Sequence, residues 1–334
     1  MPDIHGLDAG AATDRVGTAA QYARVDRFID DDGPSRGARR IRAMSGGGLE
    51  FDLHPDRALD VGAAWYRGVP LAWLASPGFA PAAAAEPTGR GWLRTWGGGL
   101  VSTCGLDAFG AHSTDAGADY PMHGRIGTTP ATLRRAEVTA EGVVVEATTR
   151  QTGVFAENLR LDRRVTAPLG GARLTIEDTL TNDAETPAGV MVLYHVNFGW
   201  PLVDEGAVLD IPSARTTPRD PDAVAGFDER LRVGAPQRGF REQVYVAEAE
   251  QASERTATIT NPRLGLRVAL TRSETLPALI EWKMLATRHY AIGFEPANTP
   301  VITGRADAHA AGKLPFLEPG AAVSYRIDLE VSEP

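Results

Sequence analysis

The sequence predicts an all-β protein with only a few short helices. Short segments alternate apolar and polar residues, most clearly "VSYRIDLEV" at 323–331, and such alternation is typical of a strand buried on one face. The 36 glycines and 23 prolines are scattered between these segments, as expected of turns that connect many strands. No stretch sustains a helical period for three turns, and strands do not alternate with helices, which disfavours a Rossmann domain or a TIM barrel.

The expected elements follow one another as strands separated by turns. Residues 8–22 have room for one short helix. Residues 142–149, "GVVVEATT", and 172–182, "ARLTIEDTLTN", are predicted to be neighbouring antiparallel strands. Residues 190–198, "VMVLYHVNF", are apolar on both faces, which indicates a central strand covered on both sides. Residues 264–270, "LGLRVAL", repeat the period-two alternation.

No domain boundary is visible, so residues 1–334 are expected to form a single domain, with residues 1–20 as an N-terminal extension. The loop at 76–90 is rich in proline and small residues and is interpreted as an insertion over one end of a sheet. Glycine runs at 46–48 and 97–99 lack the spacing of a nucleotide-binding loop and are predicted to be tight turns.

The composition excludes several classes of partner. The net charge is −9, and no basic block carries interleaved aromatic residues, so no nucleic acid is expected. No apolar run approaches the ~20 residues that cross a bilayer, so no membrane partner is expected. Cys104 is the single cysteine, which rules out an internal disulfide and a cysteine-based zinc site. A cytoplasmic location is the resulting expectation.

Four segments carry polar residues within apolar or glycine-rich surroundings. They are "YPMHGRIGTTPA" with His123 and Arg125, "LYHVNFGWPL" with His195 and Asn197, "LIEWKML" with Glu281, Trp282 and Lys283, and "YAIGFEPANTP" with Glu295 and Asn298. Two residues apart on a strand, His195 and Asn197 point to the same face. Burying the carboxylate of Glu295 costs free energy unless the group is paired with a partner or takes part in the chemistry of a site. General acid–base chemistry by His195 and Glu295 is therefore the favoured interpretation, and a histidine satisfied within the core is the alternative for His195.

Metal and nucleophile chemistry fit less well. His123, His195 and Glu295 provide a two-histidine, one-carboxylate set, but no close ligand spacing such as HExxH occurs, so no metal is expected. No GxSxG motif marks a hydrolase serine. Cys104 in "STCGLD" is better explained as a buried apolar residue than as a nucleophile.

A set of segments resembles the aldose 1-epimerase (galactose mutarotase) superfamily, and more closely a bacterial branch of aldose 1-epimerase-like proteins. The matching segments are "GLEFDLHPDRALDVG", "STCGLDAFG", "MHGRIGTTPA", "VFAENLRLDRRV", "LYHVNFGWPLVDEG", "REQVYV", "IEWKML" and "YAIGFEPANTPVITGR". They span residues 49–305, most of the chain. The resemblance implies a β-supersandwich of two large antiparallel sheets packed face to face, with an open carbohydrate cleft.

The resemblance also implies roles for individual residues. His195 takes the place of the general acid that protonates the sugar ring oxygen, and Glu295 takes the place of the base. His123, beside a glycine, takes the place of a sugar contact. Val196 replaces the proline that follows the family's histidine. The family's N-terminal Asn–Arg pair has no match, and Arg57 in "HPDRALD" is the candidate substitute.

Further residues are candidates for binding the sugar. Asn197 would fix a hydroxyl beside His195, Asn298 follows Glu295 in "GFEPAN", and Trp282 or Trp92 would stack on a sugar face unless they are core aromatics. Arg125, Lys283 and Arg305 would bind an anionic group. The alternative is that these three cations pair with Glu281, Glu242 or Asp107.

The predicted function is a cofactor-independent isomerase that interconverts the α and β anomers of an aldose or aldose derivative by ring opening and reclosure. A non-catalytic carbohydrate-binding protein is one alternative, because a fold does not fix a function. An epimerase or isomerase acting on an acidic or otherwise modified sugar is the other. The expected partner is a monosaccharide or sugar derivative, and a homodimer is left open.

Overall fold

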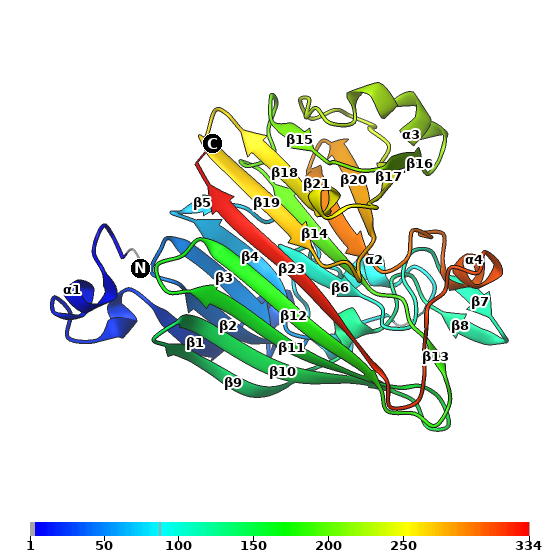
Figure 1. Cartoon of the computed structure of the whole chain (residues 1–334), viewed down its shortest axis with the longest axis horizontal. Coiled ribbons are helices and arrows are strands. Elements are labelled where there is room, and N and C mark those ends of the chain that lie inside the picture. The colour runs from blue at the N-terminus through cyan, green and yellow to red at the C-terminus, as the bar shows by residue number, and fades with distance from the viewer. Residues whose placement is uncertain (1–3, 87, 334) are drawn as a thin grey trace.

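Two large antiparallel sheets face each other in the computed structural model, which describes residues 4–86 and 88–333 (Figure 1). One sheet has 11 strands in the order β1-β2-β3-β4-β6-β14-β21-β20-β17-β16, with β5 paired to β4. The other has eight strands in the order β15-β18-β19-β23-β12-β11-β10-β9. The prediction of an all-β fold built from two large antiparallel sheets with short helices is confirmed.

The strands of the larger sheet are β1 (Arg24–Ile29), β2 (Arg39–Met44), β3 (Leu49–His54), β4 (Asp60–Tyr66), β5 (Val69–Pro70), β6 (Val101–Cys104), β14 (Leu193–Gly199), β16 (Arg215–Pro218), β17 (Gln243–Glu248), β20 (Ala278–Ala286) and β21 (His289–Ala297). Those of the smaller sheet are β9 (Thr132–Thr139), β10 (Gly142–Thr152), β11 (Asn158–Pro168), β12 (Arg173–Asn182), β15 (Val208–Asp210), β18 (Thr256–Asn261), β19 (Leu266–Arg272) and β23 (Ala322–Ser332). Two small two-stranded sheets pair β7 (Ser113–Asp115) with β8 (Ala118–Tyr120), as a hairpin, and β13 (Ala188–Gly189) with β22 (Phe316–Leu317), which lie far apart in the chain. The α-helices are α1 (Ala9–Thr13), α2 (Trp92–Thr95), α3 (Pro221–Ala225) and α4 (Arg305–Ala310).

The strand patterns of the sequence explain where each strand lies. β14 is buried along its whole length and occupies a central position in the larger sheet, as a segment that is apolar on both faces predicts. β23 alternates buried and exposed residues, as its period-two pattern predicts. The predicted neighbours at 142–149 and 172–182 are wrong as a pair, because β11 lies between β10 and β12 and bonds to both.

The inner faces of both sheets form one apolar core between them. Phe51, Leu53 and Phe198 of the larger sheet and Leu161 and Ile176 of the smaller one belong to it, and all are almost fully buried. Burial of this apolar area is the main source of stability for such a sandwich. A turn at 46–48 closes one end, where a Cβ on Gly47 would lie 2.3 Å from the Gly170 carbonyl oxygen, so only glycine fits.

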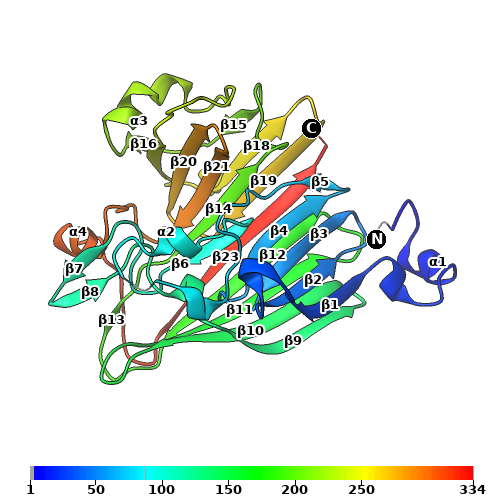
Figure 2. The ribbon, with the colours of Figure 1, turned by 180° about the vertical axis from the view of Figure 1, so that it is seen from behind.

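A second apolar cluster covers the outer face of the larger sheet where β6, β14, β21, β20 and β17 lie side by side. Helix α2, the β7–β8 hairpin and α4 lie toward the same end of the molecule in both views (Figures 1 and 2). Helix α1 begins after an Asp8 cap and lies beyond the opposite end (Figure 1). Among residues 4–86 and 88–333, no helix is both long and apolar enough to span a bilayer.

Candidate active site

The site is built around two side chains on adjacent central strands. The register of β14 against β21 pairs Leu193 with Ala297 and Val196 with Phe294, so His195 and Glu295 lie side by side. His195 Nε2 lies 3.1 Å from Glu295 Oε1, and both residues are buried. The sheet thus fixes an imidazole and a carboxyl group in contact, with neither carried by a loop.

A pocket of about 490 Å³ opens over this pair, within the usual size range of small-molecule sites. Four of the residues predicted from the sequence as catalytic or binding line it, and they are His123, Trp282, His195 and Glu295. Trp92, named beside Trp282 as a stacking candidate, lines it as well. The pocket therefore brings together the two proposed acid–base groups, one further histidine and two aromatic rings.

Aromatic rings enclose His195 on several sides. The Trp96 ring lies 4.8 Å from the His195 ring, and the Trp282 ring lies 5.4 Å from it in an edge-on arrangement. Trp92 stacks on Trp96 at 4.3 Å and lies 4.4 Å from His123. Flat indole faces at such a site suit the C–H face of a sugar ring and exclude water.

Local backbone features hold these rings in place. The one-turn helix α2 carries Trp92, and Trp96 follows directly after its last residue. Gly293 leaves room for Trp282, because a Cβ there would lie 3.0 Å from the Trp282 Cβ and 3.0 Å from Glu295 Oε1. His123 adopts a left-handed conformation with φ of 58°, and its backbone exchanges hydrogen bonds with Gly110 and Gly105.

Burial sets the protonation of the central pair. Burial raises the pKa of Glu295 well above its usual value, Glu242 raises it further, and Arg219 opposes the shift. Burial lowers the pKa of His195 well below its usual value, His123 lowers it further, and the Asn197 amide opposes the shift. Both shifts favour uncharged groups, so the pair holds one proton over a wide range of pH.

The neighbouring groups complete the electrostatics. Burial lowers the pKa of His123 to about 4, so its imidazole is neutral at pH 7. At the rim, Glu242 accepts hydrogen bonds from Trp282 Nε1 and from Arg219, each at 3.0 Å. Arg219 was not identified from the sequence, and Glu242 was named only as a possible partner of a cation, because ionic residues at the end or the start of a strand are common and carry no local signal.

Trp96 was also missed. It follows Trp92 by four positions in "GWLRTWGG", a spacing that places two indoles on one face of a helix. That spacing is present in the sequence, but the helical segment is too short to be recognised from the sequence alone.

Asn197 lies in a different place from the one predicted. It is completely buried and does not line the pocket. Its amide nitrogen donates to the carbonyl oxygens of Gly99 and His195, at 3.0 and 2.8 Å. Its Oδ1 and His195 Nδ1 are buried atoms without a hydrogen-bond partner in the described part of the chain. The structure therefore gives Asn197 a place behind His195 rather than beside a sugar.

Lys283 points to the opposite face of β20 from Trp282. Its Nζ donates to the carbonyl oxygens of Glu229, Arg230 and Arg232, at 2.7, 3.2 and 2.7 Å. The structure thus places Lys283 away from the pocket, where it holds the 229–232 segment against the sheet.

The remaining predicted binding residues also lie outside the pocket lining. Arg57 donates to the carbonyl oxygens of Ala80 and Thr95, Asn298 to that of Val190, Arg305 to those of Asp107 and Gly189, and Arg125 contacts Asp107 at 3.5 Å. These side chains brace the loops around the site. The arginines that do line the pocket are Arg90 and Arg219.

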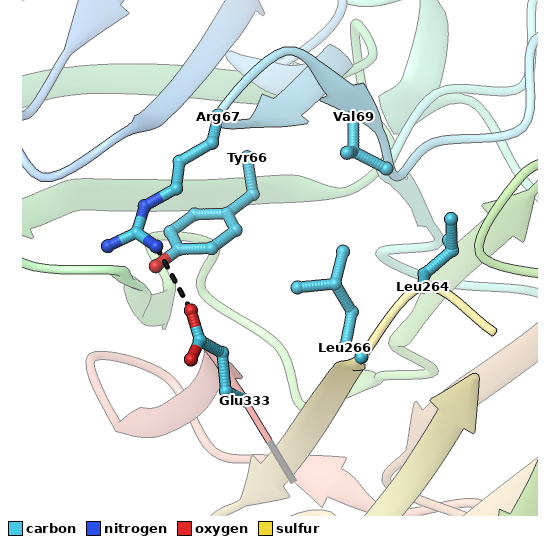
Figure 3. Close-up of a pocket in the computed structure, with 7 residues that line it drawn as sticks. Tyr66, Arg67, Val69, Leu264, Leu266 and Glu333 are labelled. Carbon is cyan, nitrogen blue, oxygen red and sulfur yellow. Dashed lines mark hydrogen bonds and ion pairs between the residues drawn. The ribbon is translucent and has the colours of Figure 1, made fainter. Parts of the chain in front are cut away.

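Another hollow of about 500 Å³ lies where the β4–β5 turn meets the start of β19 (Figure 3). Its lining is mainly apolar, and its two charged side chains, Arg67 and Glu333, bond to each other at 3.1 Å. It offers no acid–base pair.

Across the described residues, no cluster of three or more histidine, cysteine, aspartate or glutamate side chains is arranged to hold a metal ion.

Comparison with known proteins defines the family. A family model described as a domain of unknown function, DUF4432, matches residues 35–331. The chain belongs to this family. Among proteins with curated descriptions, none is significantly similar to this DUF4432 chain in sequence.

Solved structures share the fold of this DUF4432 protein. One is a Klebsiella pneumoniae subsp. pneumoniae MGH 78578 protein provisionally named an aldose 1-epimerase, 23% identical, with a TM-score of 0.86 over 92% of this chain and 83% of that one. A galactose mutarotase-like protein from Clostridium acetobutylicum is 15% identical, with a TM-score of 0.66 over 93% and 98% of the two chains. Galactose 1-epimerase from Lactobacillus acidophilus NCFM is 14% identical, with a TM-score of 0.61 over 92% and 98%. The galactose mutarotase-like fold implied by the sequence resemblance is confirmed.

Proposed function

We propose that this protein is an aldose 1-epimerase-type isomerase that interconverts the α and β anomers of an aldose or aldose derivative. The observation that carries the proposal is the 3.1 Å contact between His195 Nε2 and Glu295 Oε1 at the floor of an aromatic pocket. The fold shared with aldose 1-epimerases and mutarotase-like proteins adds support.

The reaction needs one proton removed and one proton supplied. Glu295 takes the proton of the C1 hydroxyl as the C1 carbonyl forms, and the C1–O5 bond breaks. His195 supplies the proton that O5 acquires, which gives the open-chain aldehyde. Rotation about C1–C2 presents the other face of the carbonyl, and the same two transfers in reverse close the ring as the other anomer.

Glu295 and His195 share one proton, and the position of that proton decides which of them acts as base and which as acid. Burial favours this proton on Glu295, because both groups are then uncharged. Its transfer across the 3.1 Å contact gives the carboxylate and imidazolium that the reaction uses. Arg219 favours that transfer by lowering the pKa of Glu295, and Asn197 favours it by raising the pKa of His195.

The test is anomer exchange followed by proton NMR exchange spectroscopy on a panel of aldoses, including an acidic sugar. Exchange above the spontaneous rate is expected for at least one sugar. His195→Gln and Glu295→Gln should each reduce the catalysed rate by about 10²–10⁴-fold, because each removes one proton-transfer partner. Glu281→Gln is the matched control, since this buried carboxyl on β20 lies outside the pocket. Wild-type rates in both site variants would refute the assigned roles.

The binding-module alternative makes a different prediction in the same experiment. A non-catalytic carbohydrate-binding protein would bind a sugar against the tryptophan rings and leave its anomer exchange at the spontaneous rate.

An acidic substrate would form ion pairs with Arg90 and Arg219, the arginines that line the pocket. Comparing a uronic acid with its parent aldose therefore separates the neutral from the acidic substrate class.

A further inference from the structure

One wall of the pocket beside Glu295 is apolar. Five side chains form this apolar wall, from β14, β17, β20 and two loops, and they are Leu193, Val244, Ile280, Phe109 and Ile302. Ile280 lies directly opposite Glu295 in the register of β20 against β21. The wall belongs to the apolar cluster on the outer face of the sheet rather than to the core between the sheets.

The wall offers a ligand no hydrogen-bonding side chain. Its side chains are aliphatic or aromatic, and the strands that carry Leu193, Val244 and Ile280 use their backbone groups in the β14–β21, β17–β20 and β20–β21 ladders. At the rim, Arg219 bonds to Asp220 and Glu242, and Glu242 also accepts from Trp282. Arg90 and Thr303 line the pocket as well, but neither belongs to the apolar wall. The polar side chains that a sugar could reach therefore lie outside the wall, among them His123, His195 and Glu295.

This distribution is unusual for a fully hydroxylated sugar. A hydroxyl pressed against the wall would exchange its hydrogen bonds to water for none, whereas a methyl or methylene group there would gain from burial. Polar groups of a ligand discriminate strongly only where the site can pair them. The wall therefore selects against a hydroxyl and in favour of C–H surface.

We infer that the substrate is a deoxy aldose, whose missing hydroxyl leaves a methyl or methylene group against the apolar wall. This inference rests on the proposed function, since it names the class of sugar that the same pocket would turn over. His195 and Glu295 would act at O5 and O1, and the deoxy carbon would lie against Ile280, Val244 and their neighbours.

Matched pairs of sugars test the inference. D-galactose is compared with 6-deoxy-D-galactose, L-mannose with L-rhamnose, and D-glucose with 2-deoxy-D-glucose. We expect kcat/KM for anomer exchange to favour the deoxy member of at least one pair by about 10-fold or more, the effect of one unpaired buried hydroxyl. Catalysed exchange that is equal within every pair, or faster for every hydroxylated sugar, would overturn the inference and leave the proposed function standing.

Binding provides a readout that does not depend on catalysis. Tryptophans 92, 96 and 282 line the pocket, so quenching of their fluorescence reports occupancy and gives Kd for the same pairs. Absent exchange with tighter binding of a deoxy sugar would refute the isomerase proposal but support the apolar wall. Absent exchange with no deoxy preference in Kd would overturn both.

Two variants on one strand separate the wall from general effects on β17. Val244→Thr places a hydroxyl in the wall and should reduce the deoxy preference by about 10-fold, because a hydroxylated sugar then gains a partner. Val246→Thr makes the same change two residues away, on a buried side chain that does not line the pocket, and should leave the preference unchanged. Equal effects of the two substitutions would contradict the role of the wall.

Discussion

Asn197 shows how a single side chain can act on the chemistry from behind the reacting group. Its amide nitrogen is committed to two carbonyl oxygens, which fixes the direction of Oδ1. Oδ1 and His195 Nδ1 are both buried, and neither has a hydrogen-bond partner among the described residues. The amide raises the pKa of His195 against the effect of burial, so Asn197 favours the imidazolium that the proposed reaction uses.

Opposite substitutions at Asn197 should move the pH profile in opposite directions. The active pair holds one proton, so activity falls at low pH when the pair gains a second. Asn197→Leu removes the oxygen that raises the pKa of His195, so the acidic limb of kcat/KM should move to lower pH. Asn197→Asp places a carboxylate there and should move that limb to higher pH. Loss of activity without opposite shifts would show that Asn197 only supports the fold.

Part of the site was predictable from single residues. The cost of burying a carboxylate pointed to Glu295, whereas His195 stayed open to the interpretation of a histidine satisfied within the core, and the roles of both came from the family resemblance. The period-two geometry of a strand placed Asn197 on the face of His195, but it did not say which atoms face a ligand. Local pattern also did not reveal that Arg57 and Arg305 would spend their donors on backbone carbonyl oxygens of the loops.

At the scale of elements, β20 carries pocket residues on one face and residues that do not line the pocket on the other. Ile280 and Trp282 point into the pocket, whereas Glu281 and Lys283 point to the other side of the sheet. Burial raises the pKa of Glu281 to about 8, with Arg230 3.6 Å away as its ion-pair partner. Period-two alternation gave the two faces in advance, but both are buried, so the sequence could not show which of them the pocket uses.

Lys283 is predicted to matter for the segment it anchors and not for the sugar. Lys283→Met removes the donors to the 229–232 carbonyl oxygens, so backbone amides of that segment should exchange hydrogen about 10-fold faster or more. The KM of the preferred sugar should change little. Lys313→Met, at an exposed lysine, is the control and should alter neither. A large rise in KM with unchanged hydrogen exchange would instead indicate that Lys283 contributes to sugar binding.

At the scale of the whole molecule, the layout follows from composition and alternation, but the strand order does not. Segments such as 323–331 were predicted as strands because alternation is a local property. β23 nevertheless pairs with β12 and β19, far away along the chain, and β14 contacts β6 and β21 in the same way. Such pairings depend on which apolar faces meet, and nothing local in one sequence encodes them.

A buried arginine joins the two sheets beneath the site. Arg163 of β11 is 1% exposed and uses all five of its donors, on Asp178, Asp60, Thr103 and the Ala58 carbonyl oxygen. Asp178 belongs to the smaller sheet and Asp60 to the larger one. The hydroxyl of Tyr194, which precedes His195, donates to Asp178 at 2.6 Å. The network therefore ties β14, the strand that carries His195, to the opposite sheet.

Removing this cation should destabilise the whole sandwich. Arg163→Met leaves Asp60 and Asp178 buried without their partner, and breaking a buried ion pair in this way costs about 3–5 kcal/mol. Arg164→Met is the matched control on the next residue of β11, where the exposed side chain pairs with Glu146 and Glu177 at the surface, and it should cost about 1 kcal/mol or less. Urea unfolding of the two variants measures the difference. Equal midpoints would mean that the sheets are held by apolar burial alone, and that Arg163 is tolerated in the core rather than required there.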